Sequence, residues 1–104
     1  MPQKSLGLLT EPMFYVLMAF SRREQCGAEV TAFVERRTAG RVRLGPGTLY
    51  TILAKFEEVG YLRETEVSGR RRTYRITPAG AEAYQNELAR LRRCLADAEE
   101  EEKA

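Results

Sequence analysis

Residues 45–62 read GPGTLYTILAKFEEVGYL and carry both a start and a stop signal for one helix. Two glycines permit unusual backbone angles around Pro46, which fixes its own φ. Thr48 is the best side-chain N-cap for this helix, although Gly47 is an alternative. Apolar residues then recur at helical spacing, and Gly60 supplies the stop. The sequence therefore predicts a helix whose core-facing stripe consists of Leu49, Ile52, Leu53, Phe56 and Val59.

A line of polar side chains runs along another side of the same predicted helix. Tyr50 lies to one side of this line, which at 100° per residue consists of Thr48, Thr51, Lys55 and Glu58. A helix entering the major groove of DNA needs short polar side chains near its N-terminus, because bulky ones hold its backbone away from the base edges. Threonine can meet a hydrogen-bonding edge or a thymine methyl group, and lysine can reach phosphate or guanine. The line is therefore either a base-reading surface, with Tyr50 beside a phosphate, or an ordinary solvated face.

The rest of the chain divides into further helices and strands. These predicted elements are a helix from Thr10 to about Arg23, a helix after Gly27, a short strand at 41–44, a hairpin of strands 61–67 and 71–77, and a helix starting at Thr77-Pro78. Three helices followed by a hairpin and a last helix are the layout of a winged helix-turn-helix. The predicted fold class is mainly α with a small β-hairpin: a winged helix-turn-helix plus a C-terminal dimerisation helix.

Charge is distributed unevenly along the chain. The whole sequence has a net charge of +2, but residues 41–75 hold eight arginines and lysines against four glutamates, a net charge of +4. Residues 97–103 carry five carboxylates and one lysine, a net charge of −4. Arg70, Arg71 and Arg72 stand together at the predicted hairpin turn, where they repel one another and gain nothing from a core. A polyanion is the natural partner for this run, and a merely soluble loop tip is the alternative.

The last predicted helix carries a narrow apolar seam. Residues Ala81, Tyr84, Leu88, Leu91 and Leu95 recur at 3-4-3-4 spacing, which is typical of helix pairing. The seam packs either on its own domain or on a second chain, and we expect dimerisation through Tyr84, Leu88, Leu91 and Leu95, with Phe14 and Met18 of the apolar first helix. An effector pocket lined by Tyr15, Met18 and Leu91 competes with a closed dimer interface.

These patterns divide the chain into four expected segments. They are a flexible N-terminus at 1–9, a winged-helix DNA-binding domain at 10–77, a dimerisation helix at 78–96 and an acidic frayed tail at 97–104. The chain of 104 residues is long enough for one small domain. It has no secretory signal pattern and no apolar run of membrane-spanning length, so we expect a cytoplasmic protein without a membrane partner.

Residue types argue against an enzyme or a metal site. The sequence contains no histidine, and its two cysteines, Cys26 and Cys94, form no CxxC pair. Gly45-Pro46-Gly47-Thr48 lacks the Gly-Lys-Ser/Thr ending of a phosphate-binding loop. No nucleophile–base pairing is recognisable either. We therefore predict no catalytic residue, no metal and no cofactor.

Taken together, the motifs resemble those of PadR-type transcriptional regulators, named for the phenolic acid decarboxylase repressor. The resemblance runs from Leu8 to about Leu95 and is most specific in residues 46–50, Pro-Gly-Thr-Leu-Tyr, and in the hairpin exit at 74–80, Tyr-Arg-Ile-Thr-Pro-Ala-Gly. It implies a winged-helix DNA-binding domain, a dimerising C-terminal helix and, in some members, a small aromatic effector. The single C-terminal helix resembles the short subgroup. Ala28 departs from the family pattern, which often has a tyrosine after the glycine at position 27.

The sequence thus predicts a sequence-specific regulator that binds double-stranded DNA as a homodimer. We expect a repressor of an inverted-repeat operator, released by a small aromatic or hydrophobic effector. The predicted DNA-binding residues are Thr48, Tyr50, Thr51, Lys55, Arg70, Arg71 and Arg72. The alternative is a winged-helix module that binds an acidic protein.

Overall fold

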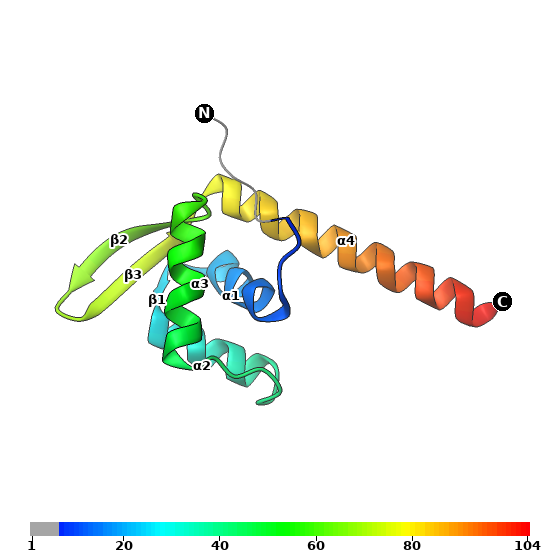
Figure 1. Cartoon of the computed structure of the whole chain (residues 1–104), viewed down its shortest axis with the longest axis horizontal. Coiled ribbons are helices and arrows are strands. Elements are labelled where there is room, and N and C mark those ends of the chain that lie inside the picture. The colour runs from blue at the N-terminus through cyan, green and yellow to red at the C-terminus, as the bar shows by residue number, and fades with distance from the viewer. Residues whose placement is uncertain (1–6) are drawn as a thin grey trace.

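A computed structural model of the chain describes residues 7–104 and has four helices and three strands in this part (Figure 1). The helices are α1 (Glu11–Arg22), α2 (Gly27–Arg37), α3 (Pro46–Glu58) and α4 (Pro78–Lys103), and the strands are β1 (Gln25–Cys26), β2 (Leu62–Ser68) and β3 (Arg71–Ile76). The β2–β3 hairpin projects from one side of the body and α4 leaves it on the other (Figure 1). The arrangement is a winged-helix fold, as predicted.

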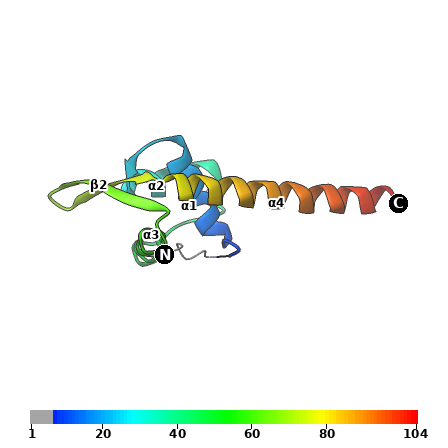
Figure 2. The same ribbon diagram turned by 90° about the horizontal axis from the view of Figure 1, so that it is seen from above.

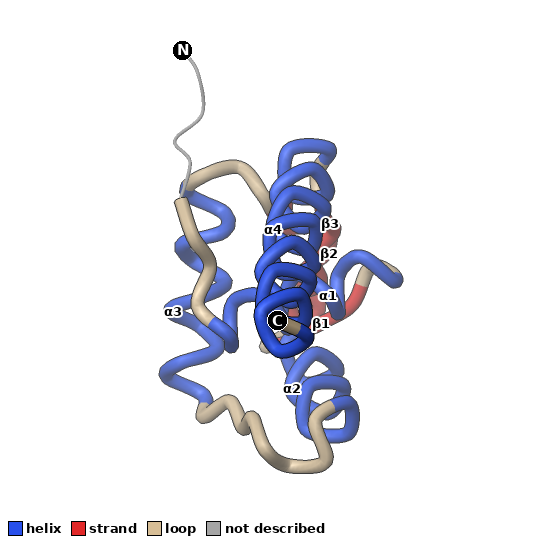
Figure 3. The backbone as a smooth tube through the Cα atoms, turned by 90° about the vertical axis from the view of Figure 1, so that its right-hand side faces the viewer, coloured by secondary structure: helices blue, strands red, loops and turns tan. Residues whose placement is uncertain are grey.

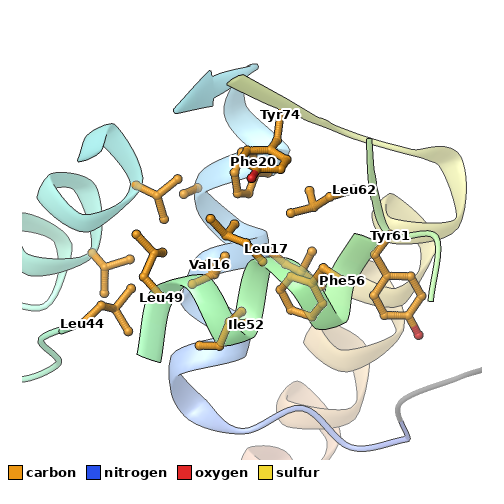
Figure 4. Packing of buried hydrophobic residues seen from close by; sticks show 14 of the residues in the cluster. Val16, Leu17, Phe20, Leu44, Leu49, Ile52, Phe56, Tyr61, Leu62 and Tyr74 are labelled. Carbon is orange, nitrogen blue, oxygen red and sulfur yellow. The ribbon is translucent and has the colours of Figure 1, made fainter. Parts of the chain in front are cut away.

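The core lies where α3 crosses α1. Figure 4 shows Leu49, Ile52 and Phe56 of α3 beside Val16 and Leu17 of α1. All five side chains are buried. The apolar stripe predicted for α3 is therefore confirmed, and it holds that helix to the body by the removal of apolar surface from water.

Both signals predicted for the start of α1 and the end of α3 are confirmed. Thr10 is the N-cap of α1, and its hydroxyl accepts a hydrogen bond of 3.3 Å from the Met13 amide. Gly60 has a φ of 81°, the left-handed conformation that a helix C′ position requires and that glycine adopts without steric cost.

The third strand differs from the prediction. Residues 41–44 form no strand; instead β1, between α1 and α2, pairs antiparallel with β3 through Gln25 opposite Tyr74. The sheet order is β1-β3-β2. Ala39 has a positive φ of 52°, so the chain turns sharply after α2. The connector that follows buries Val42 and Leu44 in the core, and apolar packing rather than strand pairing orders it.

The joint between α3, the wing and α4 is held by Thr77. Its hydroxyl accepts a hydrogen bond of 3.1 Å from the Gly80 amide, which caps α4 as predicted, and it donates to the Gly60 carbonyl. The Thr77 amide also donates to the Tyr61 carbonyl at 3.0 Å. Gly80 lies against the same carbonyl so closely that any Cβ there would clash. The base of α4 is thereby fixed to the end of α3.

Helix α4 has a packed first half and an exposed second half. It projects in a straight line away from the body (Figure 2). The acidic residues 97–103, which the sequence analysis expected to fray, are helical up to Lys103. Four of these seven residues are glutamates, and glutamate, alanine and lysine all favour helix. Of the predicted flexible N-terminus, residues 1–6 lie outside the described part; Leu9 packs against the core.

The first half of α4 also contains an ion pair whose carboxylate is buried. The Glu87 side chain is 7% exposed and its two carboxylate oxygens accept hydrogen bonds of 2.7 and 2.8 Å from Arg90. These bonds lower the pKa of Glu87, and a bond from the Leu9 backbone lowers it further.

Within residues 7–104, none of the helices combines the length and the apolar character needed to cross a membrane.

Candidate nucleic-acid interface

The start of α3 differs from the predicted one. Gly45 is the N-cap and Pro46 stands in the first turn, with no side-chain cap. Thr48, the predicted cap, already lies inside the helix. Proline at the first helical position supplies a preset φ and needs no amide partner, so the helix begins three residues earlier than a side-chain cap would place it. The hydroxyl of Thr48 is consequently free for other contacts.

The outward face of α3 is lined by small and polar side chains. Thr48, Thr51 and Lys55 are exposed, as is Tyr50, which is 58% exposed. Opposite the buried stripe, the helical geometry centres this face on Gly47, Thr51 and Ala54. Gly47 and Ala54 were not among the predicted residues, because the search was for polar side chains; their small size leaves clearance on this face. Thr48 borders the face rather than occupying its centre.

Two hollows flank α3, one on each side. The first has a volume of about 540 Å³ and lies between α3 and the start of α1; its lining includes Thr48, Thr51 and Lys55. The second, of about 430 Å³, lies between Tyr50 and the turn of the wing, with Arg70, Arg71 and Arg72 around it. The predicted DNA-binding residues therefore gather in two groups on the two sides of one helical ridge.

The second hollow owes part of its width to α2. Ala28, at the position where the family pattern often has a tyrosine, lines it together with Cys26 and Gly27. A methyl group there fills less space than a phenol ring. The departure noted in the sequence thus lies directly beside the wing, and Tyr50 is the aromatic side chain that borders this hollow.

The wing turn is a two-residue link, and Gly69 there has a φ of 61°. Two of its arginines have partners: Arg71 lies 3.4 Å from Glu29, and Arg72 lies 3.5 Å from Glu64. Both arginine side chains are more than half exposed, so these pairs contribute little stability and phosphate groups can replace the carboxylates. Arg70 has no ion pair within the part of the chain that the structure describes.

Glu29 connects the wing to the start of α2. Its carboxylate accepts a hydrogen bond of 2.9 Å from the Cys26 amide, the main cause of the lowered pKa of Glu29. The nearby charges of Arg23 and Arg71 lower this pKa further. Glu29 is therefore held ionised beside the wing and orients Arg71 toward the second hollow.

The connector arginines that precede α3 are already paired. Arg41 donates to Glu11 at 2.8 Å and to the Tyr15 hydroxyl at 3.2 Å. Arg43 lies 3.9 Å from Glu35. Both pairs join the connector to neighbouring helices, but all four side chains are more than half exposed, so these pairs contribute as little stability as those of the wing.

The residues predicted for dimerisation fall into two groups. Tyr84 stacks on Phe14 of its own chain, with ring centroids 5.3 Å apart, and Leu88 is half-buried. Leu91 and Leu95 are 37% and 60% exposed. Tyr84 therefore packs on its own domain, which was the alternative to dimerisation. Leu91 and Leu95, at the far end of the seam, are exposed to solvent.

The three residues predicted to line an effector pocket are not brought together in one chain. Met18 borders a hollow with Tyr84, whereas Tyr15 packs beside Phe14 and Arg41. Leu91 lines neither this hollow nor any other described above. Cys26 is buried and Cys94 exposed, and both are free thiols. Residues 7–104 contain no cluster of three or more side chains suited to binding a metal ion.

Comparison with known proteins gives one family match. A sequence model of the transcriptional regulator PadR-like family matches residues 16–86, which include α2, α3 and the wing. An uncharacterised 37.1 kDa protein in transposon Tn4556 of Streptomyces fradiae is 38% identical over 79 residues, or 73% of this chain. The chain spans about a fifth of the length of that relative, 22%.

Several solved structures have a similar fold. A transcriptional regulator from Clostridium thermocellum superposes with a TM-score of 0.76 at 21% identity, covering 89% of this chain and 97% of the other. Bacillus subtilis PadR, solved in complex with operator DNA, superposes with a TM-score of 0.64 at 16% identity, covering 73% of this chain and 45% of that one. At these identities the likeness concerns the fold.

Proposed function

The chain belongs to the PadR-like family of transcriptional regulators, and from this premise we propose that it is a repressor that binds an inverted-repeat operator in double-stranded DNA as a homodimer. The observation that carries the proposal is the ridge formed by α3. This ridge has a small, polar outer face and a hollow on each side, one of them bordered by three arginines. A helix inserted into the major groove has one phosphate backbone on each side of it, and the two hollows suit those two backbones.

Base reading is assigned to the first two turns of α3. Thr48 and Thr51 are short enough to let the helix backbone approach the base edges, and Gly47 and Ala54 leave further clearance. Lys55 lies at the end of this stretch, where it reaches phosphate or guanine. The glutamates at 57 and 58 follow immediately, and their charge excludes the last turn of α3 from the phosphates.

Phosphate binding is assigned to the wing. Arg70 has no carboxylate partner among residues 7–104, and the exposed pairs of Arg71 and Arg72 exchange their glutamates for phosphate oxygens at little cost. The Tyr50 hydroxyl lies on the same side of α3 and adds a further contact. In this assignment residues 10–77 form the DNA-binding unit, and α4 from Pro78 onward forms the dimerisation element.

Dimerisation follows from the free part of the seam. Pairing of Leu91 and Leu95 with a second copy removes them from water and relates two α3 ridges by a two-fold axis. Such a dimer binds half-sites separated by about one DNA turn, roughly 34 Å, or a multiple of it. Release by a small aromatic or hydrophobic effector stays a prediction, and any pocket that combines Tyr15, Met18 and Leu91 requires the partner chain.

The test is selection of bound sequences from a random DNA pool, followed by anisotropy titrations of the selected site over a range of salt. We expect a spaced inverted repeat. Thr51→Ala should change the preferred base at one position and leave the salt slope unchanged. Arg71→Ala should weaken binding to all sequences and reduce the salt slope by about one unit. Arg93→Ala, on the exposed far part of α4, is the matched charge control.

Two outcomes contradict the proposal, and a third contradicts the assignment of the wing to phosphates. The absence of any enriched sequence removes sequence-specific binding. Binding that ignores salt and competitor DNA favours the alternative, an acidic protein as the partner of the wing. An Arg71→Ala variant with altered base preference and an unchanged slope shows that the wing reads bases instead of phosphates.

A further inference from the structure

A third hollow lies away from the α3 ridge and has an unbalanced charge. Three helices, α1, α2 and α4, enclose its volume of about 510 Å³. Met18, Phe33 and Tyr84 form apolar and aromatic walls. The arginines at its mouth are Arg22, Arg36 and Arg37. Viewed along α4 from its C-terminal end, α2 lies below α4 and α3 to one side (Figure 3), so this hollow is separate from the two beside α3.

The three arginines at this mouth have no carboxylate partner among residues 7–104. Arg36 instead lies over the Phe33 ring, 5.5 Å from its centroid. Other arginines nearby differ, because Arg23 pairs with Glu29 and Arg43 with Glu35. Three like charges held together next to an apolar wall favour an anionic occupant that brings its own apolar surface.

The end of α4 has the complementary properties. The seam continues past Leu95 at the same 3-4 spacing through Ala98 to Glu102, and Glu99 lies beside it. Asp97 and Glu100 fall on the opposite side of the helix. None of the carboxylates in residues 97–102 has an ion pair within the described chain. The seam-facing side of this end therefore offers apolar and anionic groups together.

We propose that, in the homodimer, the C-terminal end of α4 docks into the hollow between α1, α2 and α4 of the other protomer, with Glu99 and Glu102 against Arg22, Arg36 and Arg37. The occupant is thus a second copy of this chain. This inference rests on the dimer of the proposed function and adds to it a second contact, ionic in character, at each end of the paired helices.

The spacing of the seam supports this docking. Antiparallel pairing with Leu88 opposite the partner's Leu91 places the partner's Leu95 opposite Tyr84, because the two helices run past each other in equal steps. Tyr84 is a wall of the hollow. The partner's Glu99 and Glu102 then follow at about 6 and 10 Å beyond the partner's Leu95, since an α-helix rises about 1.5 Å per residue. The pairing that buries the leucines therefore carries the acidic end past Tyr84, the α4 residue that lines the hollow together with the three arginines.

Sedimentation equilibrium of the full chain at about 50 mM and 500 mM salt tests the docking, with circular dichroism as a check that each variant is folded. Glu99→Lys with Glu102→Lys should weaken the dimer roughly tenfold or more at low salt and much less at high salt. Asp97→Lys with Glu100→Lys changes the net charge equally on the opposite side of α4. This matched control should leave the dimer constant within about threefold. Arg36→Glu with Arg37→Glu should weaken the dimer like the first pair, and combining the two reversals should restore it.

Each remaining outcome contradicts the docking in a recognisable way. If Glu99→Lys with Glu102→Lys and Asp97→Lys with Glu100→Lys weaken the dimer equally, the docking is wrong, but the dimer itself is not contradicted. A wild-type chain that stays monomeric overturns both the dimer and the docking. If Arg36→Glu with Arg37→Glu leaves the dimer unchanged but lowers the salt slope of DNA binding, the arginines belong to the DNA-binding surface and the docking is wrong.

Discussion

Helices α3 and α4 carry the same kind of apolar repeat but bury it to very different degrees. The stripe of α3, Leu49 to Phe56, is at most 7% exposed, because α1 and the connector cover it. In α4 the first half packs on α1 through Tyr84, whereas Leu91 and Leu95 extend past the body. Apolar spacing therefore predicts that a face is buried, but it does not predict which chain covers it.

The two helices also differ in what anchors their starts. Helix α4 begins with a threonine whose hydroxyl caps it and binds the end of α3. Helix α3 begins at Gly45 without a side-chain cap. The hydrogen bonds of Thr77 hold the long helix α4 at a fixed angle to the body. The first turn of α3 has no capping side chain, so its backbone amides are accessible to a binding partner.

The largest expected effect of a single substitution is a loss of stability when the buried stripe of α3 is disrupted. Phe56→Ala should lower the free energy of unfolding by about 3–5 kcal/mol, because the ring is fully buried and a cavity remains. Urea denaturation followed by circular dichroism measures this loss. The loss should be the same at low and high protein concentration, since the contacts lie within one chain. A loss below about 1 kcal/mol would contradict the assigned core.

The next effect concerns the free half of α4. Leu91→Ala combined with Leu95→Ala should weaken dimerisation by roughly ten-thousandfold, because the homodimer buries four leucines and each contributes about 1.5 kcal/mol. Sedimentation equilibrium measures the dissociation constant. Arg93→Ala, on the opposite side of the helix, should leave it unchanged. If the leucine variant dimerises as the wild type does, the seam is not the interface.

A smaller effect compares the two helix starts. Thr77→Ala should cost about 1 kcal/mol, because it removes the cap of α4 and the bond to the Gly60 carbonyl. Thr48→Ala should cost less than about 0.5 kcal/mol, since Thr48 is exposed and caps nothing. Thermal unfolding of both variants provides the measurement. A larger cost for Thr48→Ala would indicate that Thr48 caps α3, as the sequence predicted.

The smallest effect lies in the packed half of α4 and depends on pH. The pKa of Glu87 is lowered from its ordinary value of 4.5, chiefly by the hydrogen bonds from Arg90. The stability from this pair is therefore fully present above about pH 4.5 and is lost as the pH falls through the lower folded-state pKa. Urea denaturation at pH 7 and at about pH 3 should show a smaller loss for Glu87→Gln than for the wild type. Equal losses would mean that the pair does not contribute.

Much of the fold could be predicted because its signals are local. The cap at Thr10, the stripe of α3, the stop at Gly60 and the Thr77-Pro78 start each depend on a few neighbouring residues, and all are confirmed. The prediction of a strand at 41–44 was wrong, because strand pairing depends on residues far away in the sequence. The strand that pairs with that edge of β3 is β1. The cap at Thr48 was wrong because Pro46 starts the helix earlier.

The candidate interface could be predicted in part for the same reason. Helical spacing predicted Thr48, Thr51 and Lys55, and adjacency predicted the wing arginines; the structure places them on the two sides of α3, and their contact with DNA stays a prediction. Spacing could not reveal that Tyr50 and the wing share one hollow, nor that Glu29 orients Arg71, because these contacts join residues far apart in the chain. Gly47 and Ala54 were missed since a search for functional side chains passes over small ones.

By itself the sequence determined the start of α1, the stop of α3, the start of α4, which faces are apolar and where the charge gathers, because periodicity and backbone preference act over a few residues. The tertiary structure decided which apolar faces find cover within the chain and which remain open. It also decided that three arginines without an ion pair in the described chain line a hollow, while five carboxylates at the far end of α4 likewise have no ion pair there. Those relations depend on distances between elements, and only the packing of α1, α2 and α4 around a shared core sets them.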